Sequence, residues 1–495
     1  MSIDTRGPEF AQHSTLFALP KTLIGGTQAM RQAGTLYLPK GQAEAQADYD
    51  YRLAHTFLID SYVRTLNYLT GQVFSRDPEM EDPSPEFARF SEDVDKRGNN
   101  LAVWAQQAFR AGIHAGVTFI LADYSKVQTR EGAFGVEYYD EQDETWKPRT
   151  VAAREANGWG PYLVNIAADD VIDAWEEPIH GMDGVVHFRF FESVDVQKDE
   201  WTREQVQQIR VLTPGAWQTF RKAKGADGKE QWAPFESGTT TMKEIPLVIF
   251  APGERIGRFA ARPSLEGLAE LCAQHWQASS GHRGMMDWLR RPIMFGKAMS
   301  HEDGFTLPAA PGLGLHSSDP NADLKAVNVV PPESVAVSAS DLKDLETQMG
   351  LYGLRLMAPK SGSVTAFQVR REASESDSTL TRWALAFQDA LEQALVYVGM
   401  WLDQDPPSVS VNTEFDVMLD DIESNTLMAA VQAGILPKQL AYDELRRRGL
   451  VRSEMDWEEA QAMMEQDARA NRLAQPQSAA ALASGLLGQT AEAGQ

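Results

Sequence analysis

The stretch SASDLKDLETQMGLYGLRLMAP, from Ser338 to Pro359, predicts a helix with a single narrow apolar stripe. The helix opens on a capping-box pattern and ends at Pro359, because proline cannot continue a helix. Such a stripe is typical of a helix that packs against neighbouring helices, so we expect its members to lie in a helix–helix contact. These members recur in strict steps of three and four: Leu342, Leu345, Met349, Tyr352 and Leu356.

A second long helix is predicted upstream of this stretch. Ser264 is a suitable N-cap, and the helical pattern stops before Pro292. Residues 293–336 are then rich in Gly, Pro, Asp and Ser, which predicts a compact irregular lobe between the two helices. The apolar side of the upstream helix is formed by Leu265, Leu268, Leu271, Cys272, His275 and Trp276.

A loop and a third long helix are predicted downstream. Lys360-Ser361-Gly362-Ser363 predicts a flexible loop, and Thr365 opens a helix that lasts to about Leu402 and would be about 55 Å long. Residues 370–379 are polar all round, so we expect only the second half of this helix to be firmly packed. The apolar face of that half comprises Leu380, Trp383, Phe387, Leu391, Leu395, Val398 and Trp401.

The first half of the chain mixes helices and strands, which predicts an α+β fold class. Residues 1–47 predict an extended arm with little regular structure, and residues 48–71 predict one amphipathic helix. A helix at 101–111 leads into a buried strand at 116–124. Alternating apolar residues and turn residues between 162 and 250 predict an antiparallel β meander.

Composition limits the classes of function. The 495 residues exceed the roughly 250–300 at which single cores stop growing, so we expect more than one packed region. The 46 Lys and Arg against 70 Asp and Glu give a net charge of −24, which disfavours tight wrapping of nucleic acid but suits a conduit in which DNA must slide. The single cysteine, Cys272, excludes an intramolecular disulfide, and neither a signal peptide nor a membrane span is indicated.

Motifs for chemistry are incomplete. The sequence contains no P-loop, and the stretch at His301 begins like a zinc-protease motif but lacks the second histidine. A pair of short helices around residues 434–437 is a candidate DNA-reading element. However, Arg446, Arg447 and Arg448 lie at the C-terminal end of the second helix, whereas a reading helix contacts bases through its N-terminal residues.

The order of three segments resembles that of tailed-bacteriophage portal proteins, the head–tail connectors, in particular a divergent branch classified as a phage domain of unknown function. The resemblance covers most of the chain, from Tyr49 to about Gly449. The segments are YDYRLAHTFLIDSYVRTLNYLTGQVFSRDPE at Tyr49–Glu79, PSLEGLAELCAQHWQASSGHRGMMDWLRRPIMF at Pro263–Phe295 and TAFQVRREASESDSTLTRWALAFQDALEQALVYVGMWL at Thr365–Leu402.

The resemblance implies a portal-like architecture with a wing of helices and antiparallel β meander, an α-helical stem, a small clip lobe, a long tunnel-loop helix and a helical crown. The implied parts are an N-terminal arm at 1–47, the wing at 48–262, the first stem helix at 263–290, the clip at 291–336, the second stem helix at 337–358, the tunnel loop at 359–364, the long helix and a wing strand at 365–421, the crown at 422–472 and a disordered tail at 473–495.

The resemblance also implies a structural role and not an enzyme. The chain would form a homo-oligomeric ring, a dodecamer, at the portal vertex of the virion, after synthesis in the host bacterial cytoplasm. Its partners would be copies of itself, the terminase packaging motor, head–tail adaptors, the major capsid or scaffolding protein, and double-stranded DNA that passes without sequence recognition during packaging and ejection. Catalytic residues, cofactors, metals and a membrane are not expected.

Two groups of residues would carry this function. The stripe from Leu342 to Leu356 would pack between subunits in the stem. The tunnel loop, which consists of Lys360, Ser361, Gly362, Ser363 and Val364, would project into the DNA channel. Lys360 either touches phosphates transiently or is a solvated loop lysine, and the sequence favours neither.

Two alternative functions remain open at the level of sequence. The first is a phage-encoded enzyme of an unrecognised, hydrolase-like class built on the β-rich middle, with catalytic residues too dispersed to form a motif. The second is a helix-turn-helix DNA-binding protein that uses the C-terminal helical pair. The net charge of −24 disfavours the second alternative because phosphate binding needs cations.

Overall fold

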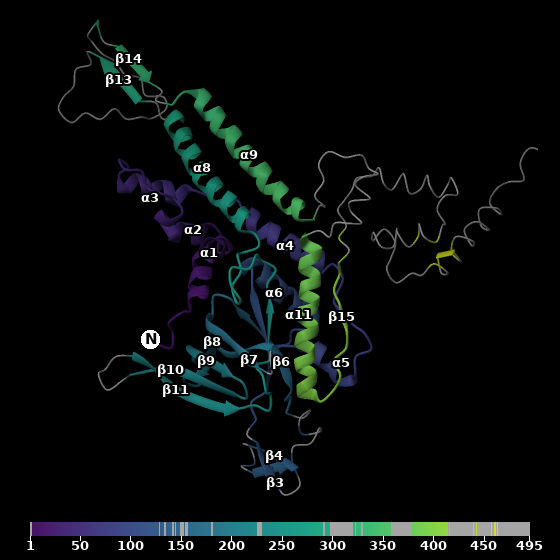
Figure 1. The fold of residues 1–495 in the computed structure, drawn as a ribbon. Helices are drawn as coiled ribbons and strands as arrows, with labels where there is room; N and C mark the ends of the chain where they lie inside the picture. Colours follow the sequence, from purple (N-terminus) through teal and green to yellow (C-terminus); the bar gives the residue numbers. More distant parts are fainter. Residues whose placement is uncertain are drawn as a thin grey trace, which may run out of the picture. The chain divides into compact units, whose positions relative to one another are not determined.

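The computed structural model (Figure 1) describes most of the first 413 residues. The described residues are 2–290 apart from gaps at 128, 133–134, 141–142, 144, 149–152, 154–156, 180–181 and 225–229, then 293–297, 320–321, 323–327, 330–357, 379–413 and 415, and isolated positions between 439 and 463. The chain divides into two units, Met1–Phe415 and Asp416–Gln495. The predicted tunnel loop, the polar start of the long helix, and most of the predicted clip, crown and tail lie outside the described residues.

The N-terminal residues are helical, so the prediction of an extended arm at 1–47 is wrong. They form α1 (Pro8–Ile24), α2 (Gly26–Ala33) and the 3-10 helix η1 (Gly34–Leu36). Pro8 is preorganised for a first helical turn, and Glu9 complements the helix dipole there. Phe10 and Phe17, seven residues apart, are both buried in the main core. The Gly- and Gln-rich composition concealed this helical spacing.

The helix predicted at 48–71 is two helices. They are α3 (Gln46–His55) and α4 (Ser61–Val73). Thr56 has an extended backbone, and its hydroxyl donates to the carbonyl of Arg52 at 2.7 Å. The same carbonyl also accepts from the backbone N–H of Thr56 at 3.0 Å, so two hydrogen bonds from Thr56 close the last turn of α3.

The next two helices begin at side-chain caps. In α5 (Pro85–Glu92) the Ser84 hydroxyl accepts from the backbone N–H of Phe87, and in α6 (Leu101–Ala115) the Asn100 amide oxygen accepts from the N–H of Val103 at 2.9 Å. The prediction of a helix at 101–111 followed by a strand is confirmed, because β2 (Thr118–Tyr124) follows α6 directly.

Three backbone segments meet where α6 ends. Gly116 has a φ of 81°, and a Cβ on it would collide with the carbonyl of Arg262. Gly253 approaches the same carbonyl, and its N–H donates to the carbonyl of Gly116 at 3.0 Å. The N–H of Ser264 donates to the carbonyl of Ile113 at 3.2 Å. The junction therefore holds the start of the next long helix against α6.

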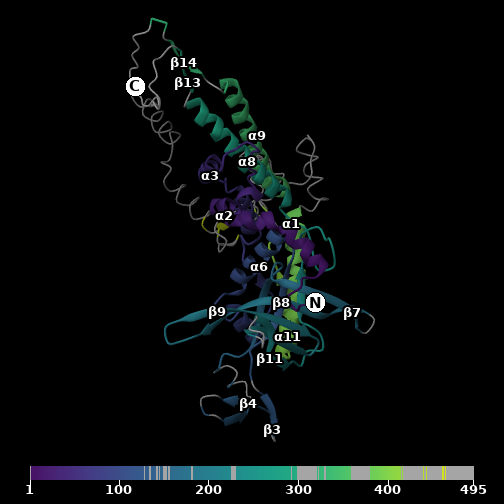
Figure 2. The ribbon, with the colours of Figure 1, turned by 90° about the vertical axis from the view of Figure 1, so that its left-hand side faces the viewer.

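The predicted antiparallel meander is confirmed as a five-stranded sheet in the order β11-β10-β9-β8-β7 (Figure 2). Gly215, with a φ of 74°, occupies the turn between β9 and β10. The strands are β7 (Val171–Ile179), β8 (Met182–Gln197), β9 (Arg203–Thr213), β10 (Ala216–Lys224) and β11 (Glu230–Thr239).

A second sheet has the order β12-β2-β6 and is also antiparallel. It adds β6 (Pro161–Ala167) and β12 (Leu247–Phe250) to β2. Smaller pairings involve β1 (Glu79–Met80) with β15 (Val409–Ser410), β13 (Ile293–Lys297) with β14 (Asp323–Val327), and β3 (Thr129–Gly132), β4 (Gly135–Asp140) and β5 (Thr145–Pro148). The α+β class is therefore confirmed.

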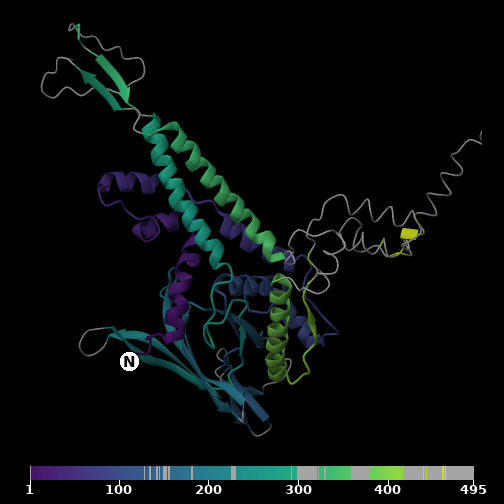
Figure 3. The same ribbon diagram turned by 45° about the horizontal axis from the view of Figure 1, so that its top comes forward.

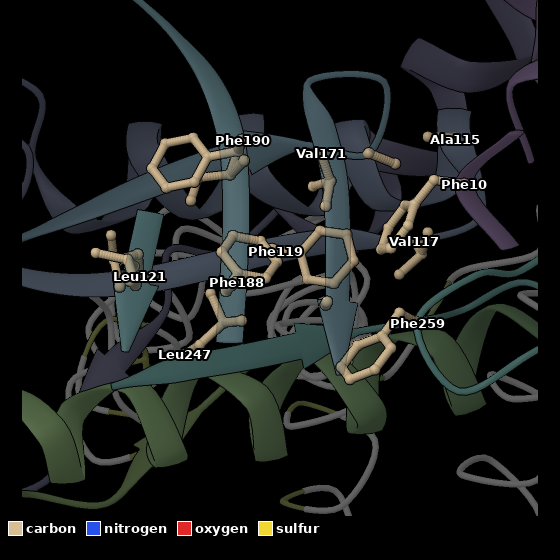
Figure 4. Close-up of a cluster of buried hydrophobic side chains, with 14 of the residues drawn as sticks. Phe10, Ala115, Val117, Phe119, Leu121, Val171, Phe188, Phe190, Leu247 and Phe259 are labelled. Atoms are coloured by element: carbon tan, nitrogen blue, oxygen red, sulfur yellow. The ribbon is translucent and has the colours of Figure 1, made fainter. Parts of the chain in front are cut away.

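The main core lies between the two larger sheets and α1 (Figure 4). Phe119 from β2 packs against Phe188 from β8, with ring centroids 5.3 Å apart, and Phe10 from α1 lies 6.3 Å from Phe119. Val171 and Phe259 complete this part of the cluster. The N-terminal helix is thus a component of the core and not an appendage.

A second set of buried aromatics attaches α11 (Thr379–Leu402) to the sheet of β2. Phe387 lies 5.0 Å from Phe250 of β12 and 5.4 Å from Phe109 of α6, ring centre to ring centre. Six of the seven residues of the predicted apolar face are buried, and Trp401 is partly buried. The prediction that this half of the long helix is firmly packed is confirmed.

Two long helices, α8 (Glu266–Arg290) and α9 (Pro332–Met357), lie side by side as an antiparallel hairpin (Figures 1 and 3). The helix predicted to begin at residue 337 or 338 begins instead at Pro332, so the predicted lobe at 291–336 ends earlier. Proline fits the first turn of a helix, and Glu333 complements the dipole at that end.

Candidate functional site on the α8–α9 hairpin

The predicted apolar stripe on α9 contacts α8 of the same chain. Met349 is 1% exposed, and its sulfur lies 3.7 Å from the Sγ of Cys272. Tyr352 reaches Gly267 near the start of α8, where an added Cβ would lie 3.1 Å from the tyrosine oxygen. A larger residue than glycine there would require the Tyr352 side chain to shift by a few tenths of an ångström.

The other stripe residues are less buried. Leu342 and Leu345 are partly buried, and Leu356 belongs to α9 although its side chain lies outside the described residues. The predicted helix–helix contact is therefore present within one hairpin. The packing of these residues against a second subunit stays a prediction.

Polar groups also line the contact between the two helices. His275, with 4% of its side chain exposed, has its Nε2 3.4 Å from a carboxylate oxygen of Glu346, which is half exposed. This distance permits an ion pair if the imidazole is protonated, but the geometry is not that of a hydrogen bond, and both ring nitrogens are buried without one. Seven residues further on, about two helical turns, Nδ1 of His282 lies 3.1 Å from the hydroxyl of Ser338.

These contacts explain residues that could suggest chemistry. His275 and His282 each contact a residue of α9, and no cluster of three or more metal-ligating side chains occurs among the residues that the structure describes. Burial raises the pKa of the Cys272 thiol to about 12, so it stays protonated and unreactive near neutral pH. The inner side of the hairpin is therefore a packing surface.

The outward side of the hairpin carries large apolar residues that the sequence pattern did not single out. Val337 is 71% exposed, Trp288 is 55% exposed and Leu351 is 41% exposed. None of the three residues belongs to the predicted apolar stripe. The signal for them in the sequence is that an apolar residue stands where helical periodicity predicts a polar one. Away from the His275 contact, exposed acidic residues of α9 include Glu333, Asp341 and Asp344.

A cavity of about 620 Å³ opens at the foot of the hairpin, next to the first turn of α11. Its lining includes Tyr352, Trp383 and the arginines Arg262 and Arg382. Both arginines are already engaged, because Arg262 bonds the carboxylate of Glu266 at 3.1 Å and Arg382 the hydroxyl of Thr379 at 3.4 Å.

The tunnel-loop residues predicted at 360–364 lie outside the described residues, so their position is not part of this site. Within the described ranges, no helix combines the length and the apolar character needed to cross a membrane.

These features define an α+β protein whose candidate site is a two-helix hairpin, packed on its inner side and partly apolar on its outer side. Residues 264–402, which include the hairpin and α11, match the family model described as "Domain of unknown function (DUF4055)". The match confirms the resemblance to a branch classified as a phage domain of unknown function. A search of curated proteins finds no match.

Three solved structures are similar at 12% sequence identity, and each covers 78% of this chain. They are the neck of a native GTA particle computed with C12 symmetry (TM-score 0.37, 89% of that chain), the neck of an empty GTA particle computed with C6 symmetry (0.38, 88%) and the virion of a native gene transfer agent particle (0.36, 88%).

Proposed function

We propose that this chain is a structural subunit of a portal-like ring in a phage-like particle, and that the ring forms a channel for double-stranded DNA. The observation that carries the proposal is the outward side of the α8–α9 hairpin. Val337, Trp288 and Leu351 are exposed with respect to the part of the chain that the structure describes, and further copies would cover them in a ring. This role is non-enzymatic.

Charge supports a conduit over a DNA-gripping protein. The net charge of the chain is −24. A channel formed by chains of this charge repels phosphates and lets DNA slide, whereas tight binding would require clustered cations.

The proposed division of the chain follows the sequence resemblance, with two adjustments. The wing comprises residues 48–262 together with the N-terminal helices, and the stem comprises α8 and α9, with the second stem helix beginning at Pro332. The clip is the segment between these two helices in the sequence. The tunnel loop is residues 359–364, and the crown is residues 422–472. Terminase and head–tail adaptors would bind the clip at the portal vertex of the virion.

Electron microscopy of the purified full-length chain tests this proposal. We expect closed rings with a central hole, and a dodecamer is the expected ring size. A well-folded chain that stays monomeric or dimeric at high concentration contradicts the proposal.

A matched pair of substitutions tests the hairpin as the inter-subunit surface. Val337→Glu places a charge on the outward side and should reduce ring formation. Lys343→Glu, an exposed substitution on the same helix, should leave it intact. Equal ring yields from the two variants would show that the hairpin does not lie in the interface between subunits.

A further inference from the structure

The turn between β8 and β9 presents a single exposed indole. Trp201 is 87% exposed, the largest fraction among the large apolar residues that the structure describes. Figure 2 shows the β8–β9 hairpin running outward so that its turn lies clear of the other elements. An exposed tryptophan of this kind leaves a large apolar surface in water, which is unfavourable. A partner that covers the indole would remove this cost.

The turn is held rigidly by its own hydrogen bonds. One carboxylate oxygen of Asp199 accepts from the backbone N–H groups of Trp201 at 2.9 Å and Thr202 at 2.7 Å. The N–H of Lys198 donates to the carbonyl of Thr202 at 2.9 Å, and its ammonium pairs with Glu204 at 3.3 Å. Little conformational entropy is left to lose when the turn binds, which is a property of good interface anchors.

The same unit contains a cavity of matching size and character. Its volume is about 270 Å³, just under the roughly 300–1,000 Å³ of small-molecule sites and suited to one large side chain. Phe90 and Trp159 provide aromatic walls, and Tyr138 holds Trp159 edge to face with centroids 4.6 Å apart. Lys96 and Arg89 bring two positive charges to its lining and Glu86 one negative charge, so the lining carries a net positive charge.

We propose that Trp201 of one copy of this chain inserts into the Phe90–Trp159 cavity of a second copy. Asp199 and Glu200 flank the indole and would face the cations of the cavity, Lys96 in particular. The knob and the hole are different surfaces, so the contact is heterologous, and its repetition generates a ring when the rotation closes. This inference deepens the proposed function by naming a contact within the wing.

Cross-linking in trans tests the contact directly. One preparation carries Glu200→Cys and the other Lys96→Cys, so that Trp201 stays in place. The native Cys272 is 1% exposed and should not react. Under mild oxidation we expect disulfide-linked pairs only when the two preparations are mixed. Phe235→Cys, at an exposed position on β11, mixed with Lys96→Cys is the control and should give none.

Self-association measured by mass photometry provides the second readout. Trp201→Ala should weaken it by at least about 30-fold, as for an interface anchor, without altering the fold, because the side chain is exposed. Glu200→Lys and Lys96→Glu should each weaken it, and the two together should restore most of it. Phe235→Ala is the control and should have no effect.

The outcomes separate this contact from the ring. Rings that form without the cross-link, or from Trp201→Ala as readily as from the wild type, overturn the contact and leave the ring standing. If the cross-link forms but the protein assembles only into open filaments or only into pairs, the Trp201 contact is supported and the closed ring is contradicted.

Discussion

Arg210 links the two larger sheets as a buried cation, with 9% of its side chain exposed. It extends from β9 to the carboxylate of Asp123 on β2 at 2.7 Å, and Tyr162 donates its hydroxyl to the same carboxylate at 2.9 Å. Burial, together with the Asp123 charge, raises the pKa of Tyr162, so its hydroxyl remains a donor at neutral pH. A buried pair with a third hydrogen-bonding partner is sensitive to the loss of one member.

Replacing Arg210 should therefore destabilise the sheets strongly. Arg210→Met leaves the Asp123 carboxylate buried without its cation, and we expect a loss of about 3–5 kcal/mol in the free energy of unfolding. Urea denaturation measures it. Lys198→Met, which breaks an ion pair between two exposed side chains, is the control and should cost under about 1 kcal/mol. Similar losses from the two substitutions would contradict the expectation.

One buried histidine, His13, and one partly buried histidine, His114, make the docking of α1 sensitive to acid. His13 contacts the carbonyl of Ala115 through Nε2 at 2.7 Å, and the Nδ1 of His114 lies 3.0 Å from the hydroxyl of Tyr62. Burial lowers the pKa of both, that of His114 to about 3. The unfolded chain therefore takes up protons first as the pH falls below about 6.5.

The stabilising contribution of neutral His114 should be complete above pH 6.5 and shrink toward pH 3, by up to about 1.4 kcal/mol per pH unit. His114→Gln, which cannot titrate, should be less stable than the wild type at pH 7, and the difference should narrow in acid. Denaturation curves at pH 7, 6 and 5 measure it. Stability profiles that stay parallel would contradict the assignment.

At the scale of elements, substitutions on α9 can distinguish packing within the α8–α9 hairpin from the proposed packing between chains. Met349→Ala opens a cavity against Cys272 and should lower the free energy of unfolding by about 2–5 kcal/mol. Val337→Ser, at an exposed position of the same helix, should change it by less than about 0.5 kcal/mol. Thermal unfolding of unassembled chains distinguishes the two, and a large effect of Val337→Ser would show that this residue is packed within its own chain.

The sequence predicted some of these elements well and others poorly, for identifiable reasons. The apolar stripe on α9 and the apolar half of α11 were predicted because a period of 3.6 residues is explicit there. The helicity of residues 8–33 was missed because residues 1–47 as a whole are rich in Gly, Gln and Ala and contain Pro20 and Pro39, although Phe10, His13 and Phe17 follow a helical spacing. Periodicity also cannot tell which copy a stripe contacts, so the outward position of Val337 needed the structure.

At the scale of the whole molecule, the proposed ring gives the tunnel loop a role separate from assembly. Deleting residues 360–363 should leave rings intact, because the proposed subunit contacts lie on the hairpin and at Trp201, but should impair DNA packaging or retention. Electron microscopy and a packaging assay with the same preparation measure both properties. Loss of rings on deletion would refute the placement of the loop inside the channel.

The junction of Gly116, Gly253 and Arg262 has a mechanical consequence. Three backbones meet there without an intervening side chain, and hydrogen bonds join Gly253 to Gly116 and Ser264 to Ile113. Because backbone contacts and hydrogen bonds fix the base of α8 against α6, we expect a torque on the α8–α9 hairpin to be transmitted to α6 and the β2 sheet and not to be absorbed by bending at the base of the helix.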